Sequence, residues 1–202
     1  MRDTKANSKN TFNQQAKTYD TDMNGQHARS LYPILLERLS EIPFHTALDL
    51  GCGTGEMIKL LLEQNEQIHL YGVDISENML AVAKEKLGEK ATLVLGDSEN
   101  LPFQKDMFDV VYCNDSFHHY PKPERVLEEI RRVLKPGGSF LMGDCWQPPL
   151  GRAIMNFYMK HSKEGDVKIY SKQEILSLLS VPFHSVGWQQ IGTTACIAWG
   201  KK

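Results

Sequence analysis

The sequence has little of several features that would indicate its function at once. Its 202 residues include only 4 cysteines, far apart and without a Cys-x-x-Cys pair, so neither a disulfide framework nor a zinc site is indicated. No apolar run approaches the ~18 residues of a membrane span. Basic residues are not in excess: the formal net charge is -2, which disfavours nucleic acid as a partner. We therefore expect a cytoplasmic protein with reduced thiols that binds neither membrane nor nucleic acid.

The residues that are present predict an α/β fold in one domain. Hydrophobic residues make up 41% and charged residues 24% of the chain, which is typical of globular proteins. From residue 45 onward, short apolar segments alternate with helical patterns. We predict strands at 45–50, 68–73, 91–96, 108–114 and 139–145, with helices at 55–64, 76–87 and 123–134. This alternation is typical of a Rossmann-like, doubly wound, mostly parallel sheet.

The two ends of the chain follow other patterns. The first ten residues are polar, so we expect them to be disordered or frayed. Apolar spacing and composition then predict helices at 11–20, 26–42, 151–161 and 171–180. Two further strands at 184–192 and 193–200 predict a C-terminal antiparallel hairpin that turns near Gly192. With this hairpin the sheet has seven strands.

A glycine loop follows the first predicted strand, with Gly51, Gly53 and Gly55 in five residues. Glycines there let a ligand approach the backbone at the carboxyl edge of the sheet. Glu56 stands where the third glycine of a dinucleotide-binding Gly-x-Gly-x-x-Gly would fall, and no Gly-Lys-Ser/Thr of a P-loop follows. Asp49 and Glu56 flank the loop, and two carboxylates suit a ligand with cationic groups better than a pyrophosphate.

Polar residues also follow the next three predicted strands. Asp74 ends the second strand, where a carboxylate can accept hydrogen bonds from both ribose hydroxyls. Asp97, after the third strand, can accept a hydrogen bond from an adenine amino group. A polar and aromatic run from Asn114 to Tyr120 follows the fourth strand. Together these positions predict a nucleotide-like ligand at one edge of the sheet.

In order and spacing, these motifs resemble the class I S-adenosylmethionine-dependent methyltransferases. The similarity is greatest to the small-molecule branch that includes the ubiquinone and menaquinone biosynthesis methyltransferases. The matching segments are LDLGCGTG, GVDIS, GDSENLPF, FDVVYCNDSFHHY and RRVLKPGG, within residues 44–145. The N-terminal Phe12, Ala16, Tyr19 and Asp20 resemble the helical cap that covers the cofactor in this family. The resemblance implies S-adenosyl-L-methionine as cofactor, and its sulfonium and ammonium groups would account for the carboxylates.

The resemblance also implies a role for each matching residue. The glycines would line the cofactor loop, Asp74 would hold the ribose, and Asp49 would face the methionine part. Others would contact the adenine (Ile75, Met79, Asp97, Ser98) or lie beside the methionine part (Asn114, and Tyr19 from the cap). The implied cofactor-binding set is Tyr19, Asp49, Gly51, Gly53, Gly55, Asp74, Ile75, Met79, Asp97, Ser98 and Asn114.

Catalytic residues are less well indicated than cofactor residues. Methyl transfer from a sulfonium depends mainly on alignment, and a base is needed only when the acceptor must lose a proton. His118 and His119 are the candidate bases; alternatively, they pack over the cofactor and shape the pocket. His27 and His161 are weaker candidates. We expect no metal, because neighbouring histidines on a loop seldom give the closed tetrahedral geometry of zinc.

The implied organisation is a single methyltransferase domain in four parts. These are an N-terminal helical cap (1–43), a cofactor-binding core (44–145), a helical acceptor-side segment (146–183) and the terminal hairpin (184–202). Apolar and aromatic residues of the third part either form a partly hydrophobic acceptor pocket or pack in the core. They are Trp146, Pro148, Pro149, Met155, Phe157, Tyr158, Met159 and Tyr170.

Methyl transfer to a small-molecule acceptor, by a monomer or homodimer, is the leading hypothesis for the function. A non-catalytic S-adenosylmethionine-binding regulatory or partner protein is the alternative, although the intact stretch NDSFHHY disfavours it. A nicotinamide-dependent oxidoreductase is a third hypothesis, which Glu56 in place of the third glycine disfavours.

Overall fold

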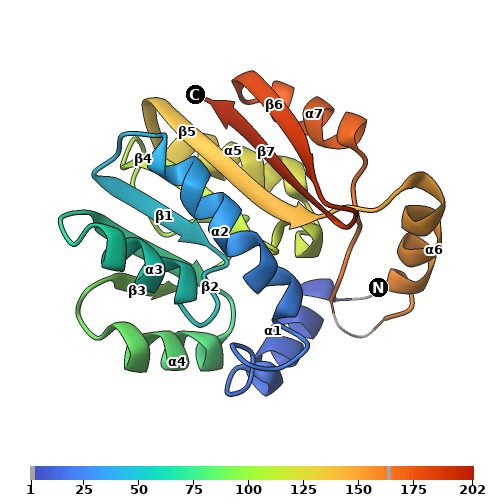
Figure 1. The fold of residues 1–202 in the computed structure, drawn as a ribbon, viewed down its shortest axis with the longest axis horizontal. Helices are drawn as coiled ribbons and strands as arrows, with labels where there is room; N and C mark the ends of the chain where they lie inside the picture. The colour runs from blue at the N-terminus through green and yellow to red at the C-terminus, as the bar shows by residue number, and fades with distance from the viewer. Residues whose placement is uncertain (1–2, 163–164) are drawn as a thin grey trace.

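The computed structural model describes residues 3–162 and 165–202 and has an α/β fold (Figure 1). One sheet contains the strands in the order β3-β2-β1-β4-β5-β7-β6. Their bounds are Thr46–Leu50 (β1), His69–Asp74 (β2), Thr92–Leu95 (β3), Phe108–Asn114 (β4), Leu134–Cys145 (β5), His184–Ile191 (β6) and Ala195–Lys201 (β7). Strands β1 to β5 pair in parallel, and β7 pairs antiparallel with both β5 and β6. The predicted seven-stranded, mostly parallel sheet with its terminal hairpin is confirmed.

Helices cover both faces of the sheet. Their bounds are Thr4–Gln15 (α1), Gln26–Ser40 (α2), Glu56–Gln64 (α3), Glu77–Leu87 (α4), Pro123–Val133 (α5), Pro149–Met159 (α6) and Lys172–Ser180 (α7), with a 3₁₀ turn at Phe117–His119 (η1). Apolar residues of α2 and α3 pack on one face, and those of α5 and α7 pack on the other (Figure 1). The central strands are therefore buried on both sides, as their continuous apolar sequences predict. None of the described helices is both long and apolar enough to cross a membrane.

Several helix ends lie where the local sequence predicts them. The Ser76 side chain accepts a hydrogen bond from the Met79 backbone N–H at 3.1 Å, which caps α4, and Gly88 ends that helix. Ser171 and Glu174 form a capping box at the start of α7. Helix α2 contains Pro33 and continues through it.

The N-terminal segment differs from the prediction. Residues 4–10, expected to be disordered or frayed, belong to α1, which ends at Gln15 instead of residue 20; residues 1 and 2 lie outside the described part. The Asp3 side chain caps the first turn, and Lys5 forms an ion pair with Asp97 at 2.7 Å. A polar helix of this kind is marginal in isolation. Contacts with distant parts of the chain therefore stabilise it, and these contacts are not visible in the local sequence.

Strand β5 also begins earlier than predicted. The segment 135–138, which precedes the predicted strand at 139–145, is part of it. Its pairing with β4 shifts register between Phe108 and Val110, and Gly137 has a φ of 77°. The segment therefore forms a bulge in the strand, for which glycine is suited.

Candidate functional site

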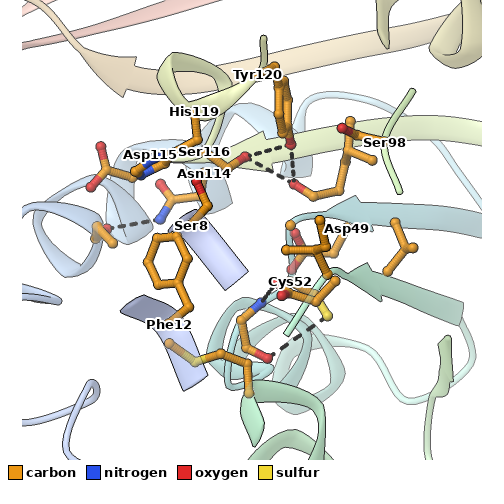
Figure 2. Close-up of a pocket in the computed structure, with 18 of the residues that line it drawn as sticks. Ser8, Phe12, Asp49, Cys52, Ser98, Asn114, Asp115, Ser116, His119 and Tyr120 are labelled. Atoms are coloured by element: carbon orange, nitrogen blue, oxygen red, sulfur yellow. Dashed lines mark hydrogen bonds between the residues drawn. The ribbon is translucent and has the colours of Figure 1, made fainter. Parts of the chain in front are cut away.

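A pocket opens at the carboxyl edge of the parallel strands. It has about 980 Å³ of empty space, part of it open to solvent, and its walls come from α1, α2 and the segments that follow β1 to β4. Figure 2 shows side chains from these segments converging on it. The lining includes most of the predicted cofactor residues and one candidate base: Tyr19, Asp49, Gly51, Gly53, Asp74, Ile75, Met79, Asp97, Ser98, Asn114 and His119.

The glycine loop is anchored to the end of β2. The backbone N–H groups of Gly51 and Cys52 donate to the Val73 carbonyl at 2.8 and 3.1 Å. One Asp74 carboxylate oxygen accepts from the Gly53 N–H at 2.8 Å, and the other accepts from the Ser76 N–H, also at 2.8 Å. Each oxygen retains a further lone pair, so Asp74 can still accept ribose hydroxyls.

Gly55 and Glu56 have roles other than those predicted. Gly55 caps α3 with a φ of 75°, and a Cβ at this position would lie 2.8 Å from Leu87. It serves the packing of α3 against α4 and lies behind the pocket wall. The Glu56 carboxylate pairs with Lys86 at 2.6 Å and with Lys59 at 3.3 Å. These lysines compensate its charge, so of the two carboxylates flanking the loop only Asp49 is available to a cationic ligand.

Asp49 is a buried carboxyl group on the pocket wall, with only 2% of its surface exposed. Burial raises its pKa to about 8; the nearby Tyr112 hydroxyl acts in the opposite direction, and the charge of Asp74 adds to the increase. A cation placed beside Asp49 would favour its ionised form. The site can therefore stabilise a positively charged ligand group.

The pocket wall at the carboxyl ends of β2 and β3 combines apolar and polar groups. Ile75 and the buried Met79 provide an apolar surface, and Ser98 adds a hydroxyl. Asp97 accepts a hydrogen bond from the Glu99 N–H at 2.9 Å and pairs with Lys5 of α1 at 2.7 Å. Lys5 therefore lies beside Asp97 at the part of the pocket where the adenine is predicted to bind. Nothing in the sequence pattern indicated this lysine.

The N-terminal cap is tied directly to the glycine loop. The Thr54 hydroxyl donates to Asp20 at 2.5 Å, and Lys86 pairs with the other Asp20 oxygen at 2.7 Å. Tyr19, which precedes Asp20, lines the pocket together with Phe12 of α1. The cap motif thus positions two aromatic rings over the cavity.

Of the two candidate bases, only His119 lies on the pocket wall. His118 is buried behind it, with its Nδ1 atom 2.6 Å from Asp144. Burial lowers the pKa of His118, but the neighbouring Cys145 and Asp144 raise it well above its usual value. His118 is therefore an imidazolium in an ion pair, which argues against a role as a base and gives a physical reason to reject this candidate. For His119, burial and the nearby His118 lower the pKa to about 4.

Sequence reasoning missed the carboxylates around these histidines. Asp115 lines the pocket and lies 2.7 Å from His27, one of the weaker candidates. Asp166 lies 3.3 Å from the Nδ1 atom of His119. Possible metal ligand atoms of these groups lie within 4.8 Å of one another, but His118 already pairs with Asp144 at 2.6 Å and lies 3.7 Å from Asp166. Asp166 follows no recognisable motif, so only the folded chain reveals its position.

Residues 146–183 do not build the pocket in the way expected, within the part of the segment that the structure describes. Trp146 and Tyr170 pack against the core, as the alternative interpretation held. Helix α6 has no buried residue among those described, and Phe157 and Tyr158 are 62% and 69% exposed. The aromatic residues of α6 therefore lie outside the cavity wall.

Comparison with known proteins assigns a class to this architecture. Residues 48–142 match the methyltransferase domain family. A demethylmenaquinone methyltransferase of Shouchella clausii is 33% identical over 157 residues, which cover 74% of this chain and 63% of that protein. The complex between the Haloferax volcanii Trm112 methyltransferase activator and a methyltransferase contains a chain with a TM-score of 0.78 and 22% identity, covering 94% of this chain and 96% of that one.

A third relative was solved with ligands. Phosphoethanolamine N-methyltransferase 2 of Haemonchus contortus, in complex with phosphomonomethylethanolamine and S-adenosylhomocysteine, has a TM-score of 0.67 and 23% identity. The alignment covers 79% of this chain and 38% of that one. At these identities the solved structures support the fold alone.

Fold and sequence together place the core of this chain in the class I methyltransferases. Within that class the chain is similar to the methyltransferases of quinone biosynthesis. It spans 63% of the length of the Shouchella clausii relative and 56% of a Thermotoga maritima relative with the same description.

Proposed function

We propose that the protein is an S-adenosylmethionine-dependent methyltransferase that acts on a small molecule. The observation that carries this proposal is the convergence of the motif residues on one pocket at the carboxyl edge of the sheet. Asp74 is available for the ribose hydroxyls, and Ile75 and Met79 offer an apolar surface to the adenine. Asp49 lies beside the loop, where the methionine part would bind.

Two features of the pocket fit such a ligand. The buried Asp49 carboxyl has a raised pKa, so it gains a partner when a cation binds. The Asn114 side chain donates to the Ala28 carbonyl at 3.1 Å, while its own buried Oδ1 atom has no hydrogen-bond partner among the described residues. An ammonium donor would satisfy this oxygen, since a buried unpaired acceptor is costly.

The proposed methyl transfer requires few catalytic groups from the protein. When bound, the cofactor supplies an activated methyl group. The loop and the cap hold the reacting groups in line and exclude water, and this alignment can account for much of the rate enhancement. His119 is neutral at pH 7, because its pKa is about 4, so its imidazole can accept a proton but is a weak base.

For the methyl acceptor, we propose only a class of compound. The names of the relatives support a small-molecule acceptor, and the near-neutral net charge is consistent with it. We further propose a single-domain cytoplasmic enzyme, acting as a monomer or homodimer. The alternative of a non-catalytic binding protein predicts cofactor binding without transfer to any acceptor.

Calorimetric titration tests the proposal. The protein is titrated with S-adenosylmethionine, S-adenosylhomocysteine and NAD, in parallel with Asp74→Ala and the control Glu89→Ala, which removes an exposed carboxylate. We expect both adenosyl compounds to bind, NAD not to bind, and only Asp74→Ala to weaken binding. Binding of NAD, or of neither adenosyl compound, would refute the proposed function. Cofactor binding without methyl transfer across an acceptor library would favour the non-catalytic alternative.

A further inference from the structure

The segment after β4 forms a distinct wall of the pocket. Asn114, Asp115 and His119 line the cavity there. Strand β4 pairs with β1 on the side opposite β2, so this wall is separated from Asp74 and Asp97 by the width of β1. A second ligand, next to the cofactor, would meet these three residues.

The charges near this wall do not balance. Hydrogen bonding to Asp115 raises the pKa of His27, and the ion pair with Asp144 keeps His118 protonated, so these two carboxylates are compensated. His119 is different. Burial and His118 lower its pKa to about 4, although Asp166, Asp115 and Asp144 act in the opposite direction. His119 is thus neutral at pH 7, and Asp166 shares the single charge of His118, whose Nε2 atom lies 3.7 Å away, with Asp144, which lies 2.6 Å from the Nδ1 atom.

Basic side chains do not correct this imbalance. Lys5 is the only lysine or arginine among the described residues that line the pocket, and it pairs with Asp97 and Glu99. A second anion at the wall would lie close to Asp115 and Asp166, and the nearby imidazoles of His27 and His118 already pair with Asp115 and Asp144. Like charges placed together at a binding site are strongly disfavoured.

The polar atoms of the wall are hydrogen-bond acceptors, and rings lie beside them. Asp115 contributes carboxylate oxygens, and its Oδ1 atom lies 2.7 Å from His27, while the Asn114 oxygen beside it is assigned to the cofactor. The Phe12 ring lies 5.1 Å from the His119 ring and 6.1 Å from the Tyr19 ring, centre to centre. Oxygen acceptors with aromatic faces suit a cationic N–H donor.

We propose that this wall binds an amine as the methyl acceptor, and that His119, positioned by Asp166, accepts the proton that the amine must lose. The inference rests on the proposed function and assigns its acceptor class. An ammonium nitrogen has no lone pair until one N–H proton passes to the imidazole of His119. The nitrogen lone pair then bonds to the methyl carbon, while the carbon–sulfur bond of the donor breaks and leaves its electrons on sulfur. The imidazole later releases its proton to solvent.

Asp166 is held firmly enough to serve as a positioning residue. The N–H groups of Val167 and Lys168 donate to the His118 carbonyl at 2.9 and 3.2 Å. The Ser8 hydroxyl of α1 donates to the Gly165 carbonyl at 3.2 Å. The carboxylate therefore faces the Nδ1 atom of His119 at 3.3 Å. In the unliganded structure the Nδ1 atom makes no hydrogen bond among the described residues, so the bond to Asp166 forms only when a ligand closes the site; that bond favours the tautomer in which Nε2 carries the lone pair. Catalytic hydrogen bonds are often poorly aligned in the free enzyme and tighten in the complex.

A binding experiment separates this inference from the proposed function. The protein is first saturated with S-adenosylhomocysteine, then titrated by calorimetry with three probes of similar size: phenethylamine, 2-phenylethanol and phenylacetate. We expect the amine to bind about tenfold more tightly than the alcohol, and the carboxylate most weakly. Asp115→Asn should remove most of this preference, because asparagine keeps the positive φ of 53° at this position but removes the charge.

A transfer assay then tests His119 and Asp166. Aliphatic and aromatic amines, phenols and carboxylates are incubated with S-adenosylmethionine, and methylated products are measured by mass spectrometry. With the best amine, His119→Gln should lower kcat about 10²-fold. Asp166→Asn should lower kcat and move the acid limb of the pH profile to lower pH, because Asp166 raises the pKa of His119. Glu89→Gln serves as the matched control and should change neither.

The outcomes are distinguishable. If S-adenosylhomocysteine binds but no amine in the panel binds or accepts a methyl group, the amine inference is wrong and the proposed function stands. Transfer to phenols or carboxylates in preference to amines also overturns it. If Asp166→Asn lowers thermal stability but leaves the pH profile in place, its assignment as a positioning residue is wrong. Failure to bind S-adenosylhomocysteine overturns both proposals.

Discussion

Cofactor binding should release a proton from Asp49. With its pKa near 8, the carboxyl group is ionised in about one tenth of the unliganded protein at pH 7. The ionised form binds a cationic ligand better, so affinity should fall as pH falls below 8 and level off above it. Between pH 9 and pH 7 the expected loss is about tenfold, or about 1.4 kcal/mol.

Titration of S-adenosylhomocysteine, which retains the ammonium group, measures this effect. Calorimetry at pH 6 to 9, repeated in two buffers of different ionisation enthalpy, counts the protons released. Asp49→Asn removes the ionisable group at nearly constant shape, so its affinity should be lower at pH 9 and almost independent of pH. An affinity of the parent protein that is constant from pH 6 to 9, with no buffer dependence, would refute the reasoning.

Three further outcomes follow from the structure. Asp74→Ala should weaken S-adenosylhomocysteine binding by about 1.5–3 kcal/mol in calorimetry, through loss of charged hydrogen bonds; unchanged affinity would contradict the ribose assignment. Gly55→Ala should lower the free energy of unfolding by about 1–3 kcal/mol in urea, because of the positive φ and the contact with Leu87. His118→Gln should cost about 3–5 kcal/mol by leaving Asp144 unpaired. Because the folded pKa of His118 is raised, this stabilisation is complete below pH ~6.5 and is lost as pH rises through the raised value; a loss that is the same at every pH at which the protein is folded would contradict the ion pair.

Much of the fold could be predicted because its signals are local. Apolar runs and helical spacing lie within single segments, and the ends of α4 depend on Ser76 and Gly88 themselves. The position of Asp74 at the end of a strand follows from the same pattern. Parallel strands then bring their carboxyl ends to one edge, so the pocket follows from the order of the motifs.

Other features depend on contacts between distant segments, which the sequence pattern does not contain. Helix α1 is polar, and its contacts with distant segments include ion pairs of its lysines with carboxylates after β3 and in α4. Of two adjacent histidines, η1 turns His118 toward Asp144 and leaves His119 at the pocket, a choice that no local rule makes.

The sequence by itself therefore determined the class of fold, the edge of the sheet that carries the site and most of the residues that line it. The tertiary structure decided which charges remain uncompensated there. Lys86 neutralises Glu56, and Asp166, which lies far from His119 in the sequence, lies 3.3 Å from its Nδ1 atom. Charge balance in a buried site depends on distances of a few ångströms between segments, and only the packed chain sets those distances.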